Sequence, residues 1–378
     1  MRLLVCILAL HAFALLGCTT RDRSDDDDAA NDDDVANDDD VADDDDVADD
    51  DDTADDDDDD DDDGAPTLVG AAALWSVSRS YPTLALEWSP LGDRVAVAGG
   101  VPGSAGSTGI LTADTGAIDS TTMLMNAPHR DLAWSADGQS LLLAGGAVFT
   151  GKANATLGNV ESWNDGCHDG DVLAIAWSPD ESMAVSGGAG AGSADPAEAC
   201  VRDAVSGGLL QEHGVSGPAV HDVAWAPDGS QFALLLDDEV GLYSGTSLLW
   251  QEWIPLGSSF AGPGQRMSWS PDSGAIAFFT AGGSQVGLID VAVGAAAAWA
   301  SVGGAISALE YSHDGRWLAV GLVAGDVDIV QISTASVVAT LATSGTVAAL
   351  SWSPGDTHLV VGGESPEVQA LELLYSAR

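Results

Sequence analysis

The sequence predicts an all-β fold, a seven-bladed β-propeller, that follows a disordered, aspartate-rich linker. Three observations predict it: one motif recurs seven times, its copies are 41 to 48 residues apart, and each copy contains short apolar runs separated by turn residues. A period in the forties with short strands is typical of a propeller blade, in which four antiparallel strands form one sheet. One such sheet cannot bury both of its faces alone, so we expect the copies to form a closed ring.

Each copy has an aromatic anchor followed by a turn sequence. In residues 173–188, LAIAWSPDESMAVSGG, two apolar runs flank the turn Ser178-Pro179-Asp180. Ser-Pro-Asp-Gly suits a type I turn, because Pro presets φ at the second position and Gly is favoured at the fourth. The anchors, which should pack between blades, are Trp88, Trp134, Trp177, Trp225, Trp269, Tyr311 and Trp352. The recurring turn aspartates, expected to be structural and not catalytic, are Asp137, Asp180, Asp228, Asp272 and Asp314.

The chain ends indicate how the ring closes. The seventh copy is followed only by a short third run, which leaves no room for a fourth strand before Arg378. At the other end, residues 71–79 (AAALWSVSR) resemble residues 295–304 (AAAAWASVGG), an outer strand that precedes Tyr311. We therefore expect the N-terminal strand to complete the last blade, which would remove a free sheet edge.

The repeats resemble WD40 repeats and the related repeats of TolB-type periplasmic propellers. The best match is residues 168–180, HDGDVLAIAWSPD, in which His168, Val172 and Trp177 have the usual WD40 positions. The resemblance covers about residues 69–378 and implies a WD40-like propeller that serves as a binding scaffold. The usual Gly-His and Trp-Asp dipeptides are missing, and Trp163-Asn164 is the nearest equivalent.

The first residues indicate export. Arg2 and a short apolar run precede Leu15-Leu16-Gly17-Cys18, which resembles the lipobox of bacterial lipoproteins. The resemblance implies a signal peptide at 1–17, acyl chains on Cys18 and, with Thr19 next, a position on the outer membrane, at its periplasmic or cell-surface side. Several acyl chains together anchor a protein stably. The alternative is an ordinary cleaved signal peptide with a chance cysteine.

Residues 18–64 are expected to form a disordered, aspartate-rich tether, and residues 65–378 the propeller. Of the 60 acidic residues, 28 lie between Asp22 and Asp63, and such a run repels itself and cannot bury apolar surface. The remaining 32 face only 8 basic residues, which argues against binding nucleic acid or an anionic membrane surface. A spacer is the main reading of the tether; weak, diffuse calcium binding is the alternative.

Two cysteines remain in the propeller, Cys167 and Cys200. In an oxidising compartment they are expected to form one disulfide, with two buried thiols as the alternative. The pairing depends on the strands of the second blade, because either residues 147–153 or residues 158–164 can form its third strand.

The sequence contains little that resembles catalytic or metal chemistry, and we predict no catalytic, cofactor or metal site. Residues 146–153, GAVFTGKA, resemble a P-loop, but Ala153 replaces the hydroxyl that would hold Mg²⁺. His213, His221 and Asp222 would form a metal site only if their loops converged. Trp250 and Trp253, on an expected outer strand, should lie on opposite faces, so that at least one is exposed.

These observations predict a non-enzymatic, lipid-anchored scaffold, a monomer that binds an envelope or extracellular protein or a glycan. Fold-level analogy carries most of this expectation, and a fold does not fix a function. One alternative is a hydrolase or lyase with its active site at the mouth of the central channel. The other is a structural or weakly calcium-binding surface protein, in which the aspartate run is the active part.

Overall fold

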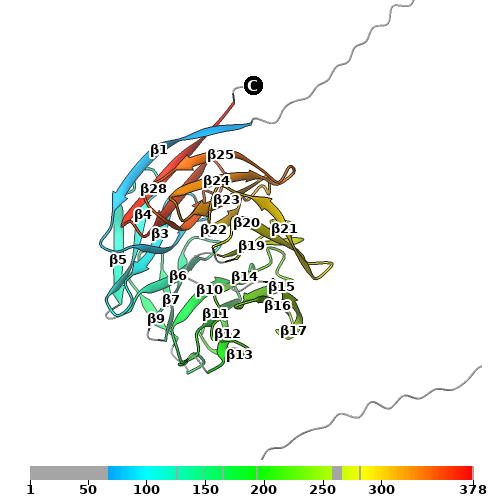
Figure 1. Ribbon diagram of the computed structural model, residues 1–378. Helices are drawn as coiled ribbons and strands as arrows, with labels where there is room; N and C mark the ends of the chain where they lie inside the picture. The colour runs from blue at the N-terminus through cyan, green and yellow to red at the C-terminus, as the bar shows by residue number, and fades with distance from the viewer. Residues whose placement is uncertain are drawn as a thin grey trace, which may run out of the picture. The chain divides into compact units, whose positions relative to one another are not determined.

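The computed structural model describes residues 67–124, 127–146, 148–163, 166–192, 195–257, 266–280 and 282–376. Within these ranges the chain is all-β: seven four-stranded antiparallel sheets succeed one another as the blades of a ring (Figure 1). The predicted seven-bladed propeller is therefore confirmed. The predicted signal peptide at 1–17, the acylation site Cys18 and the tether at 18–64 lie outside the described residues.

In each blade the first strand lies at the channel and the fourth is outermost. Blade 1 contains β2 (Thr83–Trp88), β3 (Arg94–Gly100), β4 (Gly106–Thr112) and β5 (Ile118–Leu124). Blade 2 contains β6 (His129–Trp134), β7 (Ser140–Gly145), β8 (Phe149–Asn154) and β9 (Val160–Ser162). Blade 3 contains β10 (Val172–Trp177), β11 (Met183–Gly188), β12 (Ala197–Asp203) and β13 (Leu209–Val215). Blade 4 contains β14 (Asp222–Trp225), β15 (Gln231–Leu235), β16 (Glu239–Ser244) and β17 (Trp250–Pro255).

The remaining blades follow the same plan. Blade 5 contains β18 (Met267–Trp269), β19 (Ala275–Phe279), β20 (Gln285–Asp290) and β21 (Ala295–Ser301). Blade 6 contains β22 (Ile306–Tyr311), β23 (Trp317–Leu322), β24 (Asp326–Gln331) and β25 (Ser336–Ala342). Blade 7 contains β26 (Val347–Trp352), β27 (His358–Gly363), β28 (Glu367–Tyr375) and, outermost, β1 (Leu68–Ser78).

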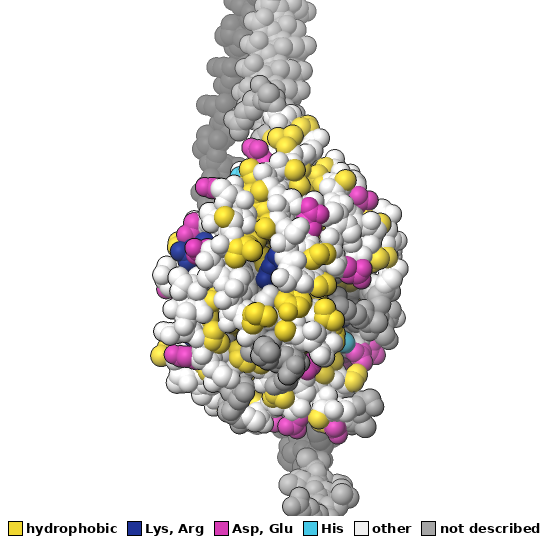
Figure 2. All heavy atoms as spheres, turned by 90° about the vertical axis from the view of Figure 1, so that its left-hand side faces the viewer, with side chains coloured by type: hydrophobic (Ala, Val, Ile, Leu, Met, Phe, Trp, Pro, Cys, Tyr) yellow, Lys and Arg dark blue, Asp and Glu magenta, His cyan; other side chains and the backbone are white. Residues whose placement is uncertain are grey.

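The middle strands are apolar on both faces because each blade lies between two others. In β3, for example, the consecutive residues Val95, Ala96 and Val97 are all fully buried. A strand with one solvated face would alternate apolar and polar residues, whereas a strand covered on both faces need not. The outermost strands are more exposed. The side of the ring that carries β1 and β5 presents acidic side chains and fewer basic ones, spread among apolar and uncharged side chains (Figure 2).

The N-terminal strand closes the ring, as predicted. β1 pairs antiparallel with β28, with Ala73 opposite Leu371 and Ser78 opposite Glu367. The buried indole of Trp75 also reaches the first blade, where its Nε1 donates a hydrogen bond of 2.5 Å to the carbonyl oxygen of Ala113. The first and the last described strands are thereby joined within one sheet, and the indole hydrogen bond connects that sheet with its neighbour.

The second blade resolves the two alternatives for its third strand. Residues 149–154 form β8, the third strand, and residues 160–162 form β9, the fourth. The first alternative, 147–153, is therefore right to within two residues. Cys167, after β9, is disulfide-bonded to the buried Cys200 on β12, and their Cα atoms lie 6.4 Å apart. The bond links the loop between blades 2 and 3 to the third strand of blade 3.

The turn after each anchor has a hydrogen bond from the N–H of its fourth residue to the carbonyl of its first, as expected for a type I turn. In blade 1 this bond joins Gly92 to Ser89 at 2.9 Å. The fourth residue has a positive φ in all seven turns, which explains the glycines there. Three turns nevertheless have another residue at this position: Glu181, Ser273 and Asp356.

Candidate functional site

A cavity of about 700 Å³ lies along the centre of the ring and is lined mainly by the innermost strands. These strands all run in the same direction, so their first residues lie at one mouth of the channel and the anchors lie toward the other. Three basic side chains line the first mouth: Arg130, His221 and Arg266. The volume is within the range of small-molecule pockets in proteins, so the channel is the principal candidate site in the described residues.

Carboxyl groups project from the innermost strands into this cavity. Glu87 and Glu310 immediately precede an anchor, and Asp131 and Asp222 lie three residues before one. Each accepts a backbone hydrogen bond from the innermost strand of the next blade. The donors are Trp134 N for Glu87 (2.7 Å), Ile175 N for Asp131 (2.8 Å), Met267 N for Asp222 (3.0 Å) and Trp352 N for Glu310 (3.1 Å).

Serine hydroxyls do the same at two other junctions. Ser268 accepts the N–H of Tyr311, and Ser351 accepts the N–H of Trp88, both at 3.1 Å. We call these six side-chain acceptors the latches. They join every pair of neighbouring blades except blades 3 and 4, where the described residues contain none and the position before the anchor is Ala176.

Confinement in the channel changes the acidity of the latch carboxyls. Burial raises the pKa of Glu87 to about 8, and the nearby Asp131 contributes in the same direction. Burial likewise raises the pKa of Asp131 to about 8 and that of Asp222 to about 6. The pKa of Glu310 is also raised well above its usual value by burial. Near neutral pH the channel is therefore far less negative than its four carboxyls suggest.

The three basic groups at the mouth have different surroundings. Arg130 Nη2 forms an ion pair of 2.8 Å with Asp171. His221 Nε2 lies 2.5 Å from Asp237 Oδ1, so blade 4 contains a His–Asp pair although the sequence lacks the usual dipeptides. Arg266 is only 3% exposed, and its Nη1 has no hydrogen-bond partner in the described part of the chain.

The predicted anchors lie between blades. All are buried except Trp177, which is partly exposed and lies under the ammonium of Lys152, 5.2 Å from the ring centroid. Four anchor indoles also donate to a carbonyl of the preceding blade: Trp134 Nε1 to Glu87 O, Trp177 Nε1 to Ala133 O, Trp269 Nε1 to Ala224 O and Trp352 Nε1 to Glu310 O. The anchors therefore hold neighbouring blades together and leave no free polar group for chemistry at those four positions.

The turn aspartates fold back on their own turns. Asp180, for example, accepts hydrogen bonds from Ser178 Oγ (2.6 Å) and from the N–H of Ser182 (3.1 Å), and these bonds lower its pKa. Asp137, Asp228, Asp272 and Asp314 accept the N–H two residues later in the same way. These contacts are structural.

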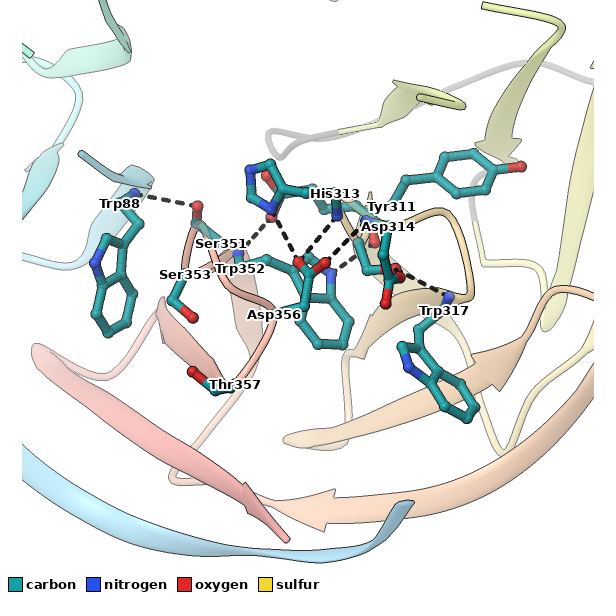
Figure 3. A network of polar contacts seen from close by, with 12 residues as sticks. Trp88, Tyr311, His313, Asp314, Trp317, Ser351, Trp352, Ser353, Asp356 and Thr357 are labelled. Atoms are coloured by element: carbon teal, nitrogen blue, oxygen red, sulfur yellow. Dashed lines mark hydrogen bonds and ion pairs between the residues drawn. The ribbon is translucent and has the colours of Figure 1, made fainter. Parts of the chain in front are cut away.

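The turn of blade 7 makes the most extensive polar contacts of this kind (Figure 3). The buried carboxylate of Asp356 accepts the backbone N–H groups of His313 (2.9 Å) and Asp314 (2.8 Å), and it lies 2.9 Å from His313 Nδ1. Asp356 thus connects the turn of blade 7 with the turn of blade 6, on the face of the ring opposite the basic mouth.

The other residues singled out in the sequence do not form one site. His213 lies on the outer strand β13 and packs against the ring of Tyr243, while His221 and Asp222 lie at the channel mouth. Within the described ranges, no three or more His, Cys, Asp or Glu side chains are grouped so that they could hold a metal ion. Lys152, from the P-loop-like stretch, lies on β8 and donates to Ala204 O at 3.1 Å, so that stretch is a strand and not a phosphate loop.

The expectation that Trp250 and Trp253 lie on opposite faces is wrong. Both belong to the outer strand β17, but a bulge places Trp250 opposite Tyr243 and Trp253 opposite Gly241. Because of this extra residue, both rings lie on the same face of the sheet, and their centroids are 6.2 Å apart. Trp250 is 52% exposed, as expected for at least one of them, and Trp253 is partly buried over Gly241.

Sequence reasoning missed the latch carboxyls Glu87, Asp131 and Glu310. Their signal was present for two of them: Glu87 and Glu310 are single acids in largely apolar strands, immediately before an anchor, whereas Asp131 follows a histidine and an arginine. A charged side chain on a strand that is buried on both faces requires a partner or a cavity.

In the described part of the chain, no helix has the length and hydrophobicity needed to cross a bilayer.

Two protein-family models match the chain. The model of the anaphase-promoting complex subunit 4 WD40 domain matches residues 267–355, from blade 5 into blade 7, and the WD domain, G-beta repeat model matches residues 162–193, which include β10 and β11. No curated protein is significantly similar in sequence to this chain. WD40 propellers are, as a kind, scaffolds for protein interaction and typically not enzymes. The two matches and the closed ring of seven sheets identify this chain as a WD40-like seven-bladed β-propeller.

Proposed function

We propose that this chain is an exported, lipid-anchored scaffold whose propeller binds an envelope or extracellular protein, or a glycan, without transforming it. The observation that carries the proposal is the Trp250–Trp253 pair on the outer strand of a closed, rigid ring. Large aromatic side chains that are held in place and exposed are the residues that dominate binding interfaces.

The surroundings of the pair support a binding role. Trp253 lies over Gly241, where a larger residue would collide with its ring, so Trp253 is held against the sheet. Trp250 extends outward beside Leu249, which is 61% exposed. A fixed aromatic base with an exposed aromatic neighbour offers a flat apolar surface, which suits either a protein side chain or the face of a sugar ring.

The experiment that tests this proposal compares substitutions of two tryptophans on outer strands. The full chain and its W250S and W299S variants are used to capture partners from envelope extract and to probe a glycan array, and the affinity of each purified partner is then measured. Trp299, on β21, is packed against the hydrophobic core of its own blade junction and serves as the control. We expect W250S to weaken binding at least about tenfold and W299S to leave it within about twofold. Equal effects of the two substitutions, or no saturable partner, would contradict the proposal.

The proposed anchor is Cys18, with the aspartate-rich residues 18–64 as the spacer. The supporting observation is the sequence Leu15-Leu16-Gly17-Cys18 after a short apolar run. In a bacterial host, the wild-type chain should incorporate an acyl label and sediment with outer membranes, and C18S should lose the label. A C18S chain that stays acylated, or a wild-type chain without acyl groups, would exclude this mode of anchoring.

A second candidate function is a hydrolase or lyase at the channel mouth. One observation favours it: Asp222, His221 and Arg266 line the same cavity, so the converging acid and basic groups that such an enzyme needs are present. Against it, Asp222 Oδ2 already accepts two backbone N–H groups and Asp131 accepts one. Turnover of a substrate panel that D222N abolishes and W250S leaves intact would favour the enzyme.

A further inference from the structure

Arg266 is a buried cation whose guanidinium is not in direct contact with an acid among the described residues. It directly precedes β18 at the basic mouth of the channel and lines the cavity, with 3% of its surface exposed. Among the described residues, Nη1 of its guanidinium has no hydrogen-bond partner, and no ion pair joins it to an acid. A buried arginine in a native protein is normally paired, because an unpaired buried charge is costly.

Other arginines of the ring show what is missing. Arg79, which is partly buried, donates to the carbonyl of Val97 and to Ser107 Oγ. Arg130, at the same mouth as Arg266, is paired with Asp171. The cost of burying these two guanidinium groups is therefore offset by partners within the protein, whereas Arg266 has a cavity in front of it.

Two more N–H groups that line this cavity are also without partners. They are Nε of Arg130 and Nε1 of the anchor Trp225, both buried. Trp225 belongs to blade 4, at the one blade junction without a latch. Four other anchor indoles bond to a carbonyl of the preceding blade. In the described part of the chain, the wall of the cavity therefore contains buried donors that lack acceptors, and Arg266, unlike Arg130, is a cation that no ion pair joins to an acid.

The neighbouring acids limit the charge of that ligand. Asp222 and Asp237 act electrostatically on Arg266, and Asp131 lines the same cavity. Because these acids already offset part of the guanidinium charge, they repel a doubly charged anion such as the phosphate dianion more strongly than a monoanion. A carboxylate also matches the planar fork of arginine with two parallel hydrogen bonds. At about 700 Å³ the cavity accommodates a small organic acid.

We propose that the channel of this propeller is a binding site for a small monocarboxylic acid, whose carboxylate is held by the guanidinium of Arg266. The apolar part of the acid lies along the alanine and tryptophan side chains of the channel wall, among them Ala174, Ala224 and Trp225. This site is separate from the aromatic surface on β17 and stands whether or not that surface binds a partner.

The test uses the full chain, a panel of small aliphatic and aromatic monocarboxylates, and their primary amides as uncharged isosteres. Binding is measured by calorimetry and by the ligand-dependent rise in unfolding temperature. We expect carboxylates to bind and amides to bind at least about tenfold more weakly. R266Q should lose the carboxylate preference. R316Q, which removes an exposed arginine outside the cavity, should keep it.

A second measurement, the stability of the ligand-free variant, distinguishes loss of ligand binding from misfolding. Because R266Q removes an unpaired buried charge, the ligand-free variant should be at least as stable as the ligand-free wild type. The proposal is overturned if carboxylates and amides shift the unfolding temperature equally, if R266Q retains the preference, or if inorganic phosphate binds more tightly than the carboxylates. Loss of partner binding in W250S leaves all of these measurements unaffected.

Discussion

At the fourth position of three turns, a residue in a strained backbone conformation accepts a hydrogen bond from the preceding blade. The fourth turn position has a positive φ throughout, and glycine occupies it in blades 1, 2, 4 and 6. In blades 3, 5 and 7 the residues are Glu181, Ser273 and Asp356, and each accepts a backbone N–H from the turn of the preceding blade. A left-handed conformation costs a non-glycine residue roughly 1–2 kcal/mol. The hydrogen bond to the preceding blade must offset that free energy cost, and a buried hydrogen bond offsets more of it than an exposed one.

The three positions therefore differ in a testable way. We expect D356G to destabilise the chain by about 1–2 kcal/mol, because Asp356 is buried and accepts bonds from two N–H groups and faces His313 Nδ1. E181G should be neutral or slightly stabilising, because Glu181 makes one exposed hydrogen bond at 3.1 Å. Urea unfolding of both variants measures the difference. A D356G chain as stable as E181G would show that the Asp356 contacts do not offset the strain.

The sequence predicted residues whose role is local and missed those whose role depends on a neighbour. The turn aspartates repeat at one position and bond within their own turn, so repetition alone revealed them. The orientation of Trp250 relative to Trp253 depends on a bulge against β16, which no local pattern of the strand records. Arg266 could not be recognised for the same reason, because its burial and lack of a partner result from the assembled channel.

The latches connect the innermost strands of neighbouring blades at six of the seven blade junctions, and the described residues contain no latch between blades 3 and 4. Ser268 and Ser351, immediately before their anchors, each accept the N–H of the next anchor at 3.1 Å. Ala176 occupies this position in blade 3 and has no acceptor side chain, and the next anchor is Trp225. At the anchor end of the channel the junction of blades 3 and 4 therefore lacks a side-chain acceptor, while at the other end backbone hydrogen bonds from Val220 N to Gly188 O and from Gly190 N to Pro218 O join the two blades.

This difference between junctions predicts opposite effects of two conservative substitutions. A176S should supply the missing acceptor for Trp225 N and stabilise the chain by about 0.5–1 kcal/mol, and S268A should remove a latch and destabilise it by a similar amount or more. Chemical denaturation measures both. If A176S gives no gain while S268A gives a loss, the junction of blades 3 and 4 is already satisfied in some other way.

Strand order was predictable where an element has a distinctive neighbour. The N-terminal strand was assigned to the last blade because Trp75 precedes Trp88 by nearly the spacing that separates Trp299 from Tyr311, and β1 does pair with β28. In blade 2 the two candidate strands are both short and mixed in polarity. Only pairing with β7, at Ser140 opposite Asn154, decides between them, and pairing is a property of two strands together.

The whole ring concentrates its acidic latches at one place, the channel axis. Glu87, Asp131 and Glu310 project from three different blades into one cavity, where burial raises the pKa of each and a neighbouring carboxyl adds to the rise. Closing the ring therefore brings together carboxyls that are far apart in the unfolded chain. The electrostatic cost of closure depends on how many of them are ionised, which makes stability a function of pH.

This cost predicts that the folded propeller loses stability as pH rises from about 6.5 to about 8. Unfolded carboxyls have released their protons well below pH 6.5, whereas Glu87 and Asp131, with pKa values raised to about 8, still hold theirs in the folded state. Since the folded state binds more protons in this window, its stability falls by up to about 1.4 kcal/mol per pH unit for each such group. Near pH 6.5 the buried His129, whose pKa burial lowers to about 4, acts in the opposite direction, because an unfolded histidine with its usual pKa of about 6.5 is still half protonated there. By pH 8 this histidine is neutral in both states and no longer contributes. Urea unfolding at several pH values measures the slope of the unfolding free energy against pH.

The variant E87Q should have a smaller slope than the wild type, and E161Q, at an exposed position on β9, should have the same slope. A slope of zero or of the opposite sign in the wild type would show that water in the channel solvates these carboxyls as fully as bulk solvent does.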